Sequence, residues 1–196
     1  MLGRANRGTG PVRDRTAAEL ATFDVPTLGD VLERYPGTRI IIELKEKSAE
    51  LAREVVEDVR RARAVDRVCL GSFSVPALRA ARALDPRLAT SAGDWEVRLA
   101  LYRSRILLSP GRVAYQAFQV PEIRNRTRVV SPRFVRLAHK AGVLVQVWTV
   151  DDPDDIRRLL DWGVDGIISD RPDVAVEVAR EWVSRQSEGL AAGAHD

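Results

Sequence analysis

A carboxylate and an ammonium group end an apolar run in residues 39–50, RIIIELKEKSAE. Because side chains alternate across a strand, Glu43 and Lys45 share a face with Ile41. If the sheet closes into a barrel, that face is the lumen, and both charges lie at the carboxyl-end rim where such barrels carry their chemistry. There a carboxylate can bind a divalent cation and a lysine can bind a phosphate. The alternative is a structural salt bridge or a solvated strand end.

Three more polar residues, in or next to predicted strands, have two interpretations each. Ser72 lies either at the active rim or in an ordinary turn. Gln146 alternates with valines, so it either lines the lumen or is a hydrogen-bonded polar residue of the core. Asp170, in the sequence ISDRP, either faces the site or caps the following helix, and we favour capping.

The chain has few residues for acid–base, thiol or zinc chemistry. Of its two histidines, His139 is expected to be a solvated or capping residue of a helix. His195 falls in a small-residue tail that we expect to be disordered. Cys69 is the single cysteine, which excludes an internal disulfide and a cysteine-rich zinc site and suggests a small buried apolar residue. General acid–base catalysis by a histidine pair is therefore not expected from these residues.

Composition narrows the class of protein. The 196 residues are 45% apolar and 30% charged, as in a globular protein, and no apolar run is long enough to span a membrane. The net charge of +3 comes from dispersed arginines, with no basic block interleaved with aromatics, so nucleic-acid binding is not expected. The sequence has no dinucleotide-binding, P-loop or zincin motif.

Short apolar runs alternate with amphipathic segments of helical period, which predicts parallel β/α units. The predicted strands are residues 39–44, 67–73, 87–92, 113–120, 143–150 and 165–169. Helices are predicted over residues 48–62, 131–142 and 151–163, the last two with proline in the first turn and glycine at the end. Six strands are two fewer than an eight-stranded barrel requires, and such barrels usually need about 250 residues.

Four segments, in order, carry a resemblance to the glycerophosphodiester phosphodiesterase family. They are VPTLGDVLERYPGTRIIIELK at 25–45, GSF at 71–73, AYQAFQVP at 114–121 and VVSPRFVRLAHKAGVLVQVWTVDDPDDIRRLLDWGVDGIISDRPD at 129–173. The resemblance implies a TIM-type barrel that hydrolyses glycerophosphodiesters to glycerol 3-phosphate and an alcohol, in lipid metabolism, with a divalent metal, Mg²⁺ or Ca²⁺.

The same resemblance assigns roles to three residues. It makes Glu43 a metal ligand and Lys45 a contact of the substrate phosphate. Trp148 corresponds to the tryptophan of the family's Trp-Thr-Val-Asn stretch, which lies by the substrate. Asp151 stands where the family usually has asparagine, so this loop departs from the family pattern.

The resemblance also implies a missing front. Four motifs of the family have no counterpart here, namely His-Arg-Gly, Glu-Asn-Thr, Glu-x-Asp and His-Asp. In the family these motifs carry both catalytic histidines and the other metal ligands. Residues 2–24 resemble the segment that follows His-Asp. The expected fold is therefore α/β, a TIM-type barrel lacking its first two β/α units with six parallel strands remaining. We expect a partial barrel over residues 1–185 and a disordered tail over 186–196.

Two functions stay open at this point, with an unrelated phosphate-handling barrel enzyme as a distant third. The favoured one is a phosphodiesterase of which this chain is an inactive, N-terminally truncated part. The alternative is a shortened, non-catalytic relative that binds a phosphate compound or a protein partner. Open barrel edges would favour self-association. We expect the chain as given to be cytoplasmic, because residues 1–14 lack the apolar core of a signal peptide, although an upstream segment could contain one.

Overall fold

Six parallel strands follow one another around an open arc in the computed structural model, which describes residues 10–193. They are β1 (Ile40–Glu43), β2 (Val68–Gly71), β3 (Ala89–Thr90), β4 (Ala117–Pro121), β7 (Leu144–Trp148) and β8 (Gly166–Ile167). The orders β1-β2-β3 and β4-β7-β8 form two parallel sheets, and a parallel bridge from Ser91 to Ala117 connects them. All six predicted strands are confirmed, although each is shorter than its apolar run.

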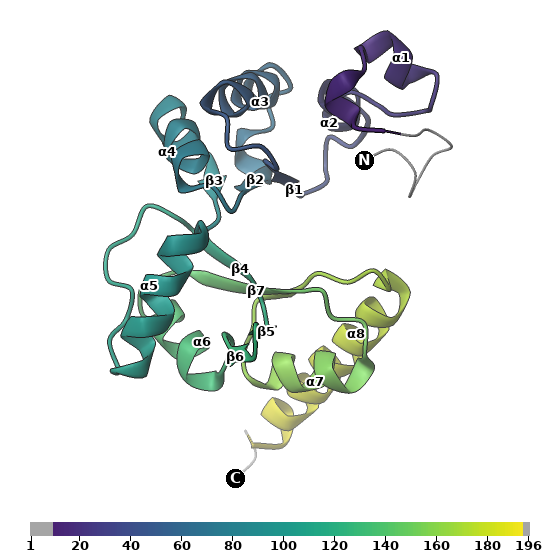
Figure 1. Ribbon diagram of the computed structural model, residues 1–196. Coiled ribbons are helices and arrows are strands. Elements are labelled where there is room, and N and C mark those ends of the chain that lie inside the picture. Colours follow the sequence, from purple (N-terminus) through teal and green to yellow (C-terminus); the bar gives the residue numbers. More distant parts are fainter. Residues whose placement is uncertain (1–9, 194–196) are drawn as a thin grey trace.

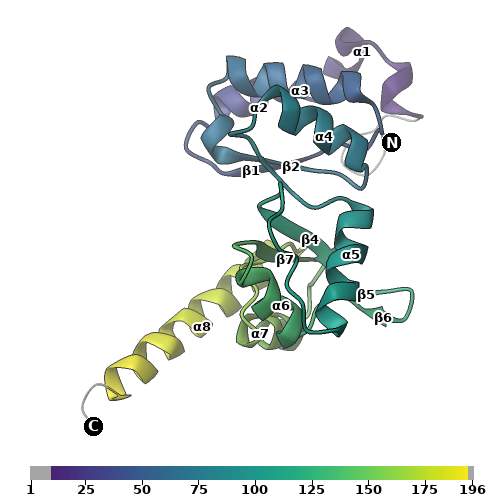
Figure 2. The ribbon, with the colours of Figure 1, turned by 90° about the vertical axis from the view of Figure 1, so that its left-hand side faces the viewer.

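Helices cover the outer side of this arc, as Figures 1 and 2 show. The α-helices are α1 (Ala17–Ala21), α2 (Leu28–Arg34), α3 (Ala49–Arg61), α4 (Val75–Leu84), α5 (Asp94–Arg105), α6 (Pro132–His139), α7 (Pro153–Asp161) and α8 (Pro172–Gly193), with 3-10 turns at Val12–Asp14 and Val65–Arg67. The predicted helix ends are confirmed, since Ser131 and Asp152 cap α6 and α7 and prolines occupy their first turns. Gly142 and Gly163 follow these helices with positive φ angles of 70° and 86°.

A small hairpin at the end of β4 was not predicted. Strands β5 (Ile123–Arg124) and β6 (Thr127–Arg128) pair antiparallel. The two residues between them, Asn125 and Arg126, have φ angles of 46° and 64°, as a type I′ turn requires. Arginine at the second position hides this turn from sequence inspection, because glycine usually stands there.

The apolar core lies between the strands and their helices, in two clusters. The first packs α2, α3 and α4 against β1 and β2 and includes Leu70 and Leu78, both fully buried. The second packs α5 to α8 against β4 and β7 around Phe118 and Phe134, whose ring centroids are 5.0 Å apart. Each cluster is built from neighbouring β/α units, so the outer layer is complete along the arc.

The inner face is different because the barrel is not closed. Among the described residues, β1 pairs only with β2 and β8 only with β7, so both end strands have an open edge. Ile41 on this face is 43% exposed. Cys69, its neighbour in the ladder, is only partly buried, so the expectation of a buried cysteine holds in part. Burial still raises the pKa of the Cys69 thiol to about 11.

The C-terminal segment departs from the prediction of a disordered tail. Helix α8 continues to Gly193 and extends away from the rest of the molecule (Figure 2). Residues 186–193, for which the sequence predicts a disordered tail, belong to this helix in the structure, and their Glu, Leu and Ala residues are good helix formers that extend a helix already begun. Residues 194–196 lie outside the described range. No helix in the part of the chain that the structure describes has the length and apolar character needed to cross a membrane.

Candidate functional site

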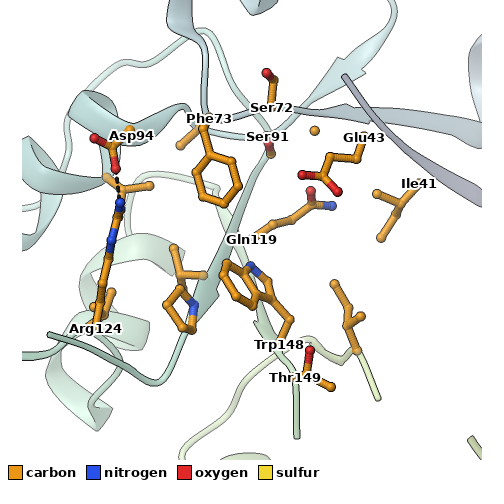
Figure 3. A pocket seen from close by; sticks show the side chains of 17 residues that line it. Ile41, Glu43, Ser72, Phe73, Ser91, Asp94, Gln119, Arg124, Trp148 and Thr149 are labelled. Atoms are coloured by element: carbon orange, nitrogen blue, oxygen red, sulfur yellow. Dashed lines mark hydrogen bonds and ion pairs between the residues drawn. The ribbon is translucent and has the colours of Figure 1, made fainter. Parts of the chain in front are cut away.

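A cavity of about 480 Å³ opens at the carboxyl ends of the strands. Residues from the ends of β1, β2, β4 and β7 and from the following loops line it (Figure 3). The prediction that Glu43 and Ile41 share the inner face is confirmed, since both line this cavity together with Trp148. Two of the three predicted site residues therefore meet at one place, although more than 100 positions separate them in the chain.

Lys45, two residues beyond the end of β1, is not among the residues that line this cavity. Its Nζ is 3.2 Å from a carboxylate oxygen of Glu43, and its side chain is 81% exposed. The Glu43 side chain is 44% exposed. The two residues thus form the rim salt bridge that was the structural alternative. Their roles as metal ligand and phosphate contact stay predictions.

Ser72 holds the ends of β1 and β2 together. Its hydroxyl donates to the backbone carbonyl of Leu44 at 2.7 Å and accepts from the amide of Ser74 at 3.0 Å. Both bonds are those of a turn residue, which was one of its two interpretations. Because Leu44 directly follows Glu43, this turn fixes the backbone that presents the Glu43 carboxylate.

A pair of glutamines lies on the inner face, and Gln119 of this pair lines the cavity. Gln119 donates from Nε2 to Oε1 of Gln146 at 2.9 Å. The two residues are ladder partners on β4 and β7, which places Gln146 on the inner face with its hydrogen bond satisfied. Gly71 leaves room for this pair, since a Cβ there would lie 2.6 Å from the side-chain oxygen of Gln119. Gln146 is therefore both a residue of the inner face and a hydrogen-bonded polar residue, as its two interpretations proposed separately.

The opposite wall is aromatic, and Trp148 is the residue of this wall that the sequence predicted as a site residue. Phe73 and Trp148 meet edge to face with centroids 6.2 Å apart. Arg124, on the hairpin, lies over Phe73 at 6.0 Å and forms an ion pair with Asp94 (Figure 3). The GSF motif pointed to the neighbourhood of Phe73, but the placement of Arg124 depends on the unpredicted hairpin. Sequence spacing contains no signal for this contact.

The loops after β7 and β8 are tied together by Asp151. One of its carboxylate oxygens accepts from the Ser169 hydroxyl at 2.7 Å and from the Asp170 amide at 2.8 Å. The Ser169 hydroxyl bond is the main cause that lowers the pKa of Asp151, with backbone amides adding to it. The Arg171 amide donates to the Ser169 hydroxyl at 2.9 Å, directly before α8 begins at Pro172, and the capping role expected of Asp170 stays a prediction. The carboxylate at position 151 thus serves as an acceptor that joins two rim loops.

His139 lies far from this rim. It is an exposed residue of the last turn of α6, and its Nε2 is 2.8 Å from Asp165, which also accepts the amide of Val145 at 2.7 Å. These contacts are at the amino ends of β7 and β8, opposite to the cavity. His195 lies outside the described residues. The described residues accordingly place no histidine at the rim.

The described residues do not by themselves form a complete site for a divalent cation. Within residues 10–193, no group of three or more His, Cys, Asp or Glu side chains is arranged to hold one. Asp94 also lines the cavity, but Arg98 and Arg124 both pair with it. Mg²⁺ and Ca²⁺ take six or more oxygen ligands, so Glu43 can supply only one part of such a site.

The chain belongs to the glycerophosphoryl diester phosphodiesterase family, whose model matches residues 1–174. It is 40% identical over 183 residues to the probable glycerophosphodiester phosphodiesterase 2 of Mycobacterium tuberculosis, covering 87% of this chain and 67% of the relative. A glycerophosphodiester phosphodiesterase structure from Parabacteroides distasonis matches with a TM-score of 0.65 and 26% identity, over 82% of this chain and 65% of that one.

A third comparison supports the fold alone. The structure of an Oleispira antarctica phosphodiesterase in complex with the product sn-glycerol-3-phosphate matches with a TM-score of 0.68 at 19% identity, over 90% of this chain and 75% of that one. The chain spans about two thirds to three quarters of the length of these relatives. The resemblance to the family and its α/β fold is thus confirmed, while the matched part forms an open arc.

Proposed function

We propose that this chain forms the larger part of a phosphodiesterase that hydrolyses glycerophosphodiesters to glycerol 3-phosphate and an alcohol. The observation that carries this proposal is that Glu43 and Trp148 line one cavity at the carboxyl ends of the strands, in an arc whose sequence matches the family model. The probable glycerophosphodiester phosphodiesterase of Mycobacterium tuberculosis, 40% identical to this chain, supports the substrate class. Such a reaction belongs to lipid metabolism.

Each predicted residue has a part in this proposal. Glu43 would supply one oxygen ligand to a divalent cation, Mg²⁺ or Ca²⁺. Lys45 has an exposed side chain that is able to turn to the substrate phosphate. Trp148, edge-on to Phe73, would form an apolar wall for the glycerol moiety. The remaining ligands and the acid–base groups would come from two further β/α units between β8 and β1, so we expect the 196 residues alone to be inactive.

One observation favours the alternative of a non-catalytic relative that binds a phosphate compound or a protein partner. Lys45 already serves as the counter-ion of Glu43, at 3.2 Å, so the Glu43 carboxylate has a cationic partner without a metal ion. A site that only binds a phosphate needs the lysine and no cation ligand. The two functions differ in whether hydrolysis appears once the arc is closed.

The deciding experiment compares two proteins at equal concentration. One is the chain as given, and the other is a chimera that begins with the N-terminal barrel segment of the Mycobacterium tuberculosis relative. Hydrolysis of glycerophosphocholine and glycerophosphoethanolamine is measured with added Mg²⁺ or Ca²⁺. We expect metal-dependent turnover from the chimera and none from the chain as given. A folded, monomeric chimera without activity would favour the non-catalytic alternative, and turnover by the short chain would refute the need for the added units.

A substitution in the chimera tests Glu43 directly. Glu43→Gln keeps the size of the side chain and removes its charge, so kcat/KM should fall by about 100-fold, roughly 2.7 kcal/mol of transition-state stabilisation. Glu46→Gln is the matched control, because Glu46 is exposed and does not line the cavity. Wild-type activity and metal affinity in Glu43→Gln would show that Glu43 is not a ligand.

A further inference from the structure

Helix α5 is apolar on two opposite sides. Its inner side packs into the core through Val97, Ala100 and Leu101. Its outer side carries Trp95, Leu99, Tyr102 and Ile106, which are 47%, 46%, 63% and 52% exposed. A surface helix normally has polar residues on its outer side, so this arrangement requires an explanation.

The exposed residues form one continuous stripe. Their spacing of four, three and four residues places them within about 60° of one another around the helix axis, at 100° per residue. Leu107 and Leu108 follow Ile106 directly in the chain, past the C-terminal end of the helix, and are 68% and 47% exposed. We call these six residues the α5 stripe. Single exposed apolar residues are ordinary, but a contiguous row of six marks an interaction surface.

The surroundings of the α5 stripe are strongly basic. Residues 75–116 contain seven arginines and three acidic residues, a net charge of +4 in a chain whose total is +3. The three acidic residues are already paired, since Asp85 and Asp94 each have two arginine partners and Glu96 pairs with Arg82.

Five arginines of this segment are exposed, and they lie before, along and after the stripe. They are Arg79, Arg87, Arg98, Arg105 and Arg112. The guanidinium of Arg79 lies over the ring of Trp95, at 5.9 Å from the ring centroid. The face therefore combines a row of apolar side chains with an excess of positive charge.

A second, smaller cavity opens beside the stripe. It has a volume of about 220 Å³, and Trp95, Leu99, Arg103 and Arg112 are among the residues that line it. Glu96 also lines this cavity, but its carboxylate is already paired with Arg82. The two guanidinium groups and the apolar side chains suit a phosphate group attached to an apolar chain, because arginine binds phosphate through paired hydrogen bonds. This feature points to a phospholipid and adds to the charge argument.

We propose that the α5 stripe docks this protein on an anionic lipid surface. Apolar side chains that insert at the interface, flanked by arginines that attract anionic head groups, are the two features such docking requires. A second copy of the chain is a poorer occupant, because a two-fold contact through this face would place the arginines of one copy against those of the other. The proposal does not depend on the hydrolytic function.

Helix α5 connects the α5 stripe to the cavity at the carboxyl ends of the strands. Asp94 and Val97, in the first turns of α5, line that cavity, while Trp95 begins the stripe. A membrane contact through the stripe therefore starts within one helical turn of the cavity mouth. Substrates that leave or enter a lipid surface would meet the cavity at short range.

Vesicle co-sedimentation with the full 196-residue chain tests the proposal. Vesicles of phosphatidylcholine alone are compared with vesicles that also contain phosphatidylglycerol, at low and at high salt. We expect binding to the anionic vesicles at low salt and a loss of at least about tenfold in affinity for Leu99→Glu combined with Tyr102→Glu. Arg105→Gln and Arg112→Gln should each weaken binding by about fivefold.

The matched control is Val183→Glu, which changes an exposed apolar residue of α8, 56% exposed and away from the stripe. It should bind as the unchanged chain does, and circular dichroism should show that all variants are folded. Absence of binding to anionic vesicles overturns the proposal. So does sedimentation velocity showing a dimer that Leu99→Glu dissociates, because the stripe would then be covered by a second copy.

Discussion

The outer and inner layers of the arc differ in how complete they are. Leu70 of β2 points to the helices and is fully buried, whereas Ile41, on the neighbouring strand, points to the inner face and is 43% exposed. Every helix-facing cluster is closed by elements adjacent in sequence. The inner face has the residues of a barrel lumen, but the strands that would cover them are not part of the arc.

The difference shows that the two layers depend on different contacts. A strand and the helix that follows it bury their shared face locally, so each β/α unit completes its part of the outer layer. A lumen is filled only when strands from opposite sides of the barrel supply side chains to common layers. The part of the fold that carries the chemistry is therefore the part that requires closure.

The largest expected effect is on the free energy of unfolding, from a substitution at the contact between α4 and α5 in the outer layer. We call this contact the seam. Arg82 and Glu96 form a nearly buried ion pair at 2.8 Å, and Arg82 also donates to the Thr90 hydroxyl and the Ser91 carbonyl. Glu96→Gln leaves the guanidinium without its counter-charge, so the free energy of unfolding should fall by about 3–5 kcal/mol in urea titrations. A loss no greater than that of a surface variant would mean that this pair does not hold the seam.

The surface control for that experiment is Asp58→Asn. Asp58 pairs with Arg61 one turn away on α3, and the Arg61 side chain is 73% exposed. Exposed pairs of this kind contribute about 0.5 kcal/mol or less, so the control should barely change the unfolding curve.

A pair of truncations compares the two layers directly. Leu70→Ala should cost about 2–5 kcal/mol because it leaves a cavity in a closed core, while Ile41→Ala should cost less than about 1 kcal/mol in the chain as given. In the chimera with a closed barrel, the cost of Ile41→Ala should rise. Equal costs for Ile41→Ala in both proteins would show that the added strands do not cover the inner face.

Acid unfolding tests the outer layer in a second way. The Asp85 side chain is 2% exposed and accepts hydrogen bonds from Arg87 and Arg60. These bonds, the Arg87 bond most of all, hold the pKa of Asp85 well below its usual range. Because the folded pKa is depressed, the stabilisation is present above the unfolded pKa, near 4, and is lost as the pH falls toward the folded value. Asp85→Asn should lower stability at neutral pH and flatten the decline of stability below about pH 4. Arg87→Gln should act in the same direction, and an unchanged acid decline in both variants would contradict this account.

Much of the outer layer could be predicted from the sequence, because its signals are local. The valines of α3 and the caps at Ser131 and Asp152 specify their elements within a few residues. On the inner face, alternation in β1 was enough to assign Glu43 and Ile41 to the cavity. The position of Arg124 could not be predicted, because it depends on an unusual turn followed by a contact with Asp94 in a separate unit.

The smallest expected effect concerns two tryptophans, one in each layer. Trp148 lines the cavity, so Trp148→Phe in the chimera should raise KM by about fivefold, roughly 1 kcal/mol, with little change in kcat, because a smaller ring makes less contact with the glycerol moiety. Steady-state kinetics with glycerophosphocholine measure this change.

Trp162 is the matched residue of the outer layer. It packs against the second core cluster, and the guanidinium groups of Arg158 and Arg128 lie 4.7 and 5.6 Å from its ring centroid. Trp162→Phe should therefore lower the free energy of unfolding and leave KM unchanged, because this ring is not among the residues that line the cavity. If Trp148→Phe instead lowers stability with unchanged kinetics, Trp148 is a packing residue at the top of the arc. The inner wall would then serve the fold in the same way as the outer layer, and the substrate contact would have to be sought at Phe73.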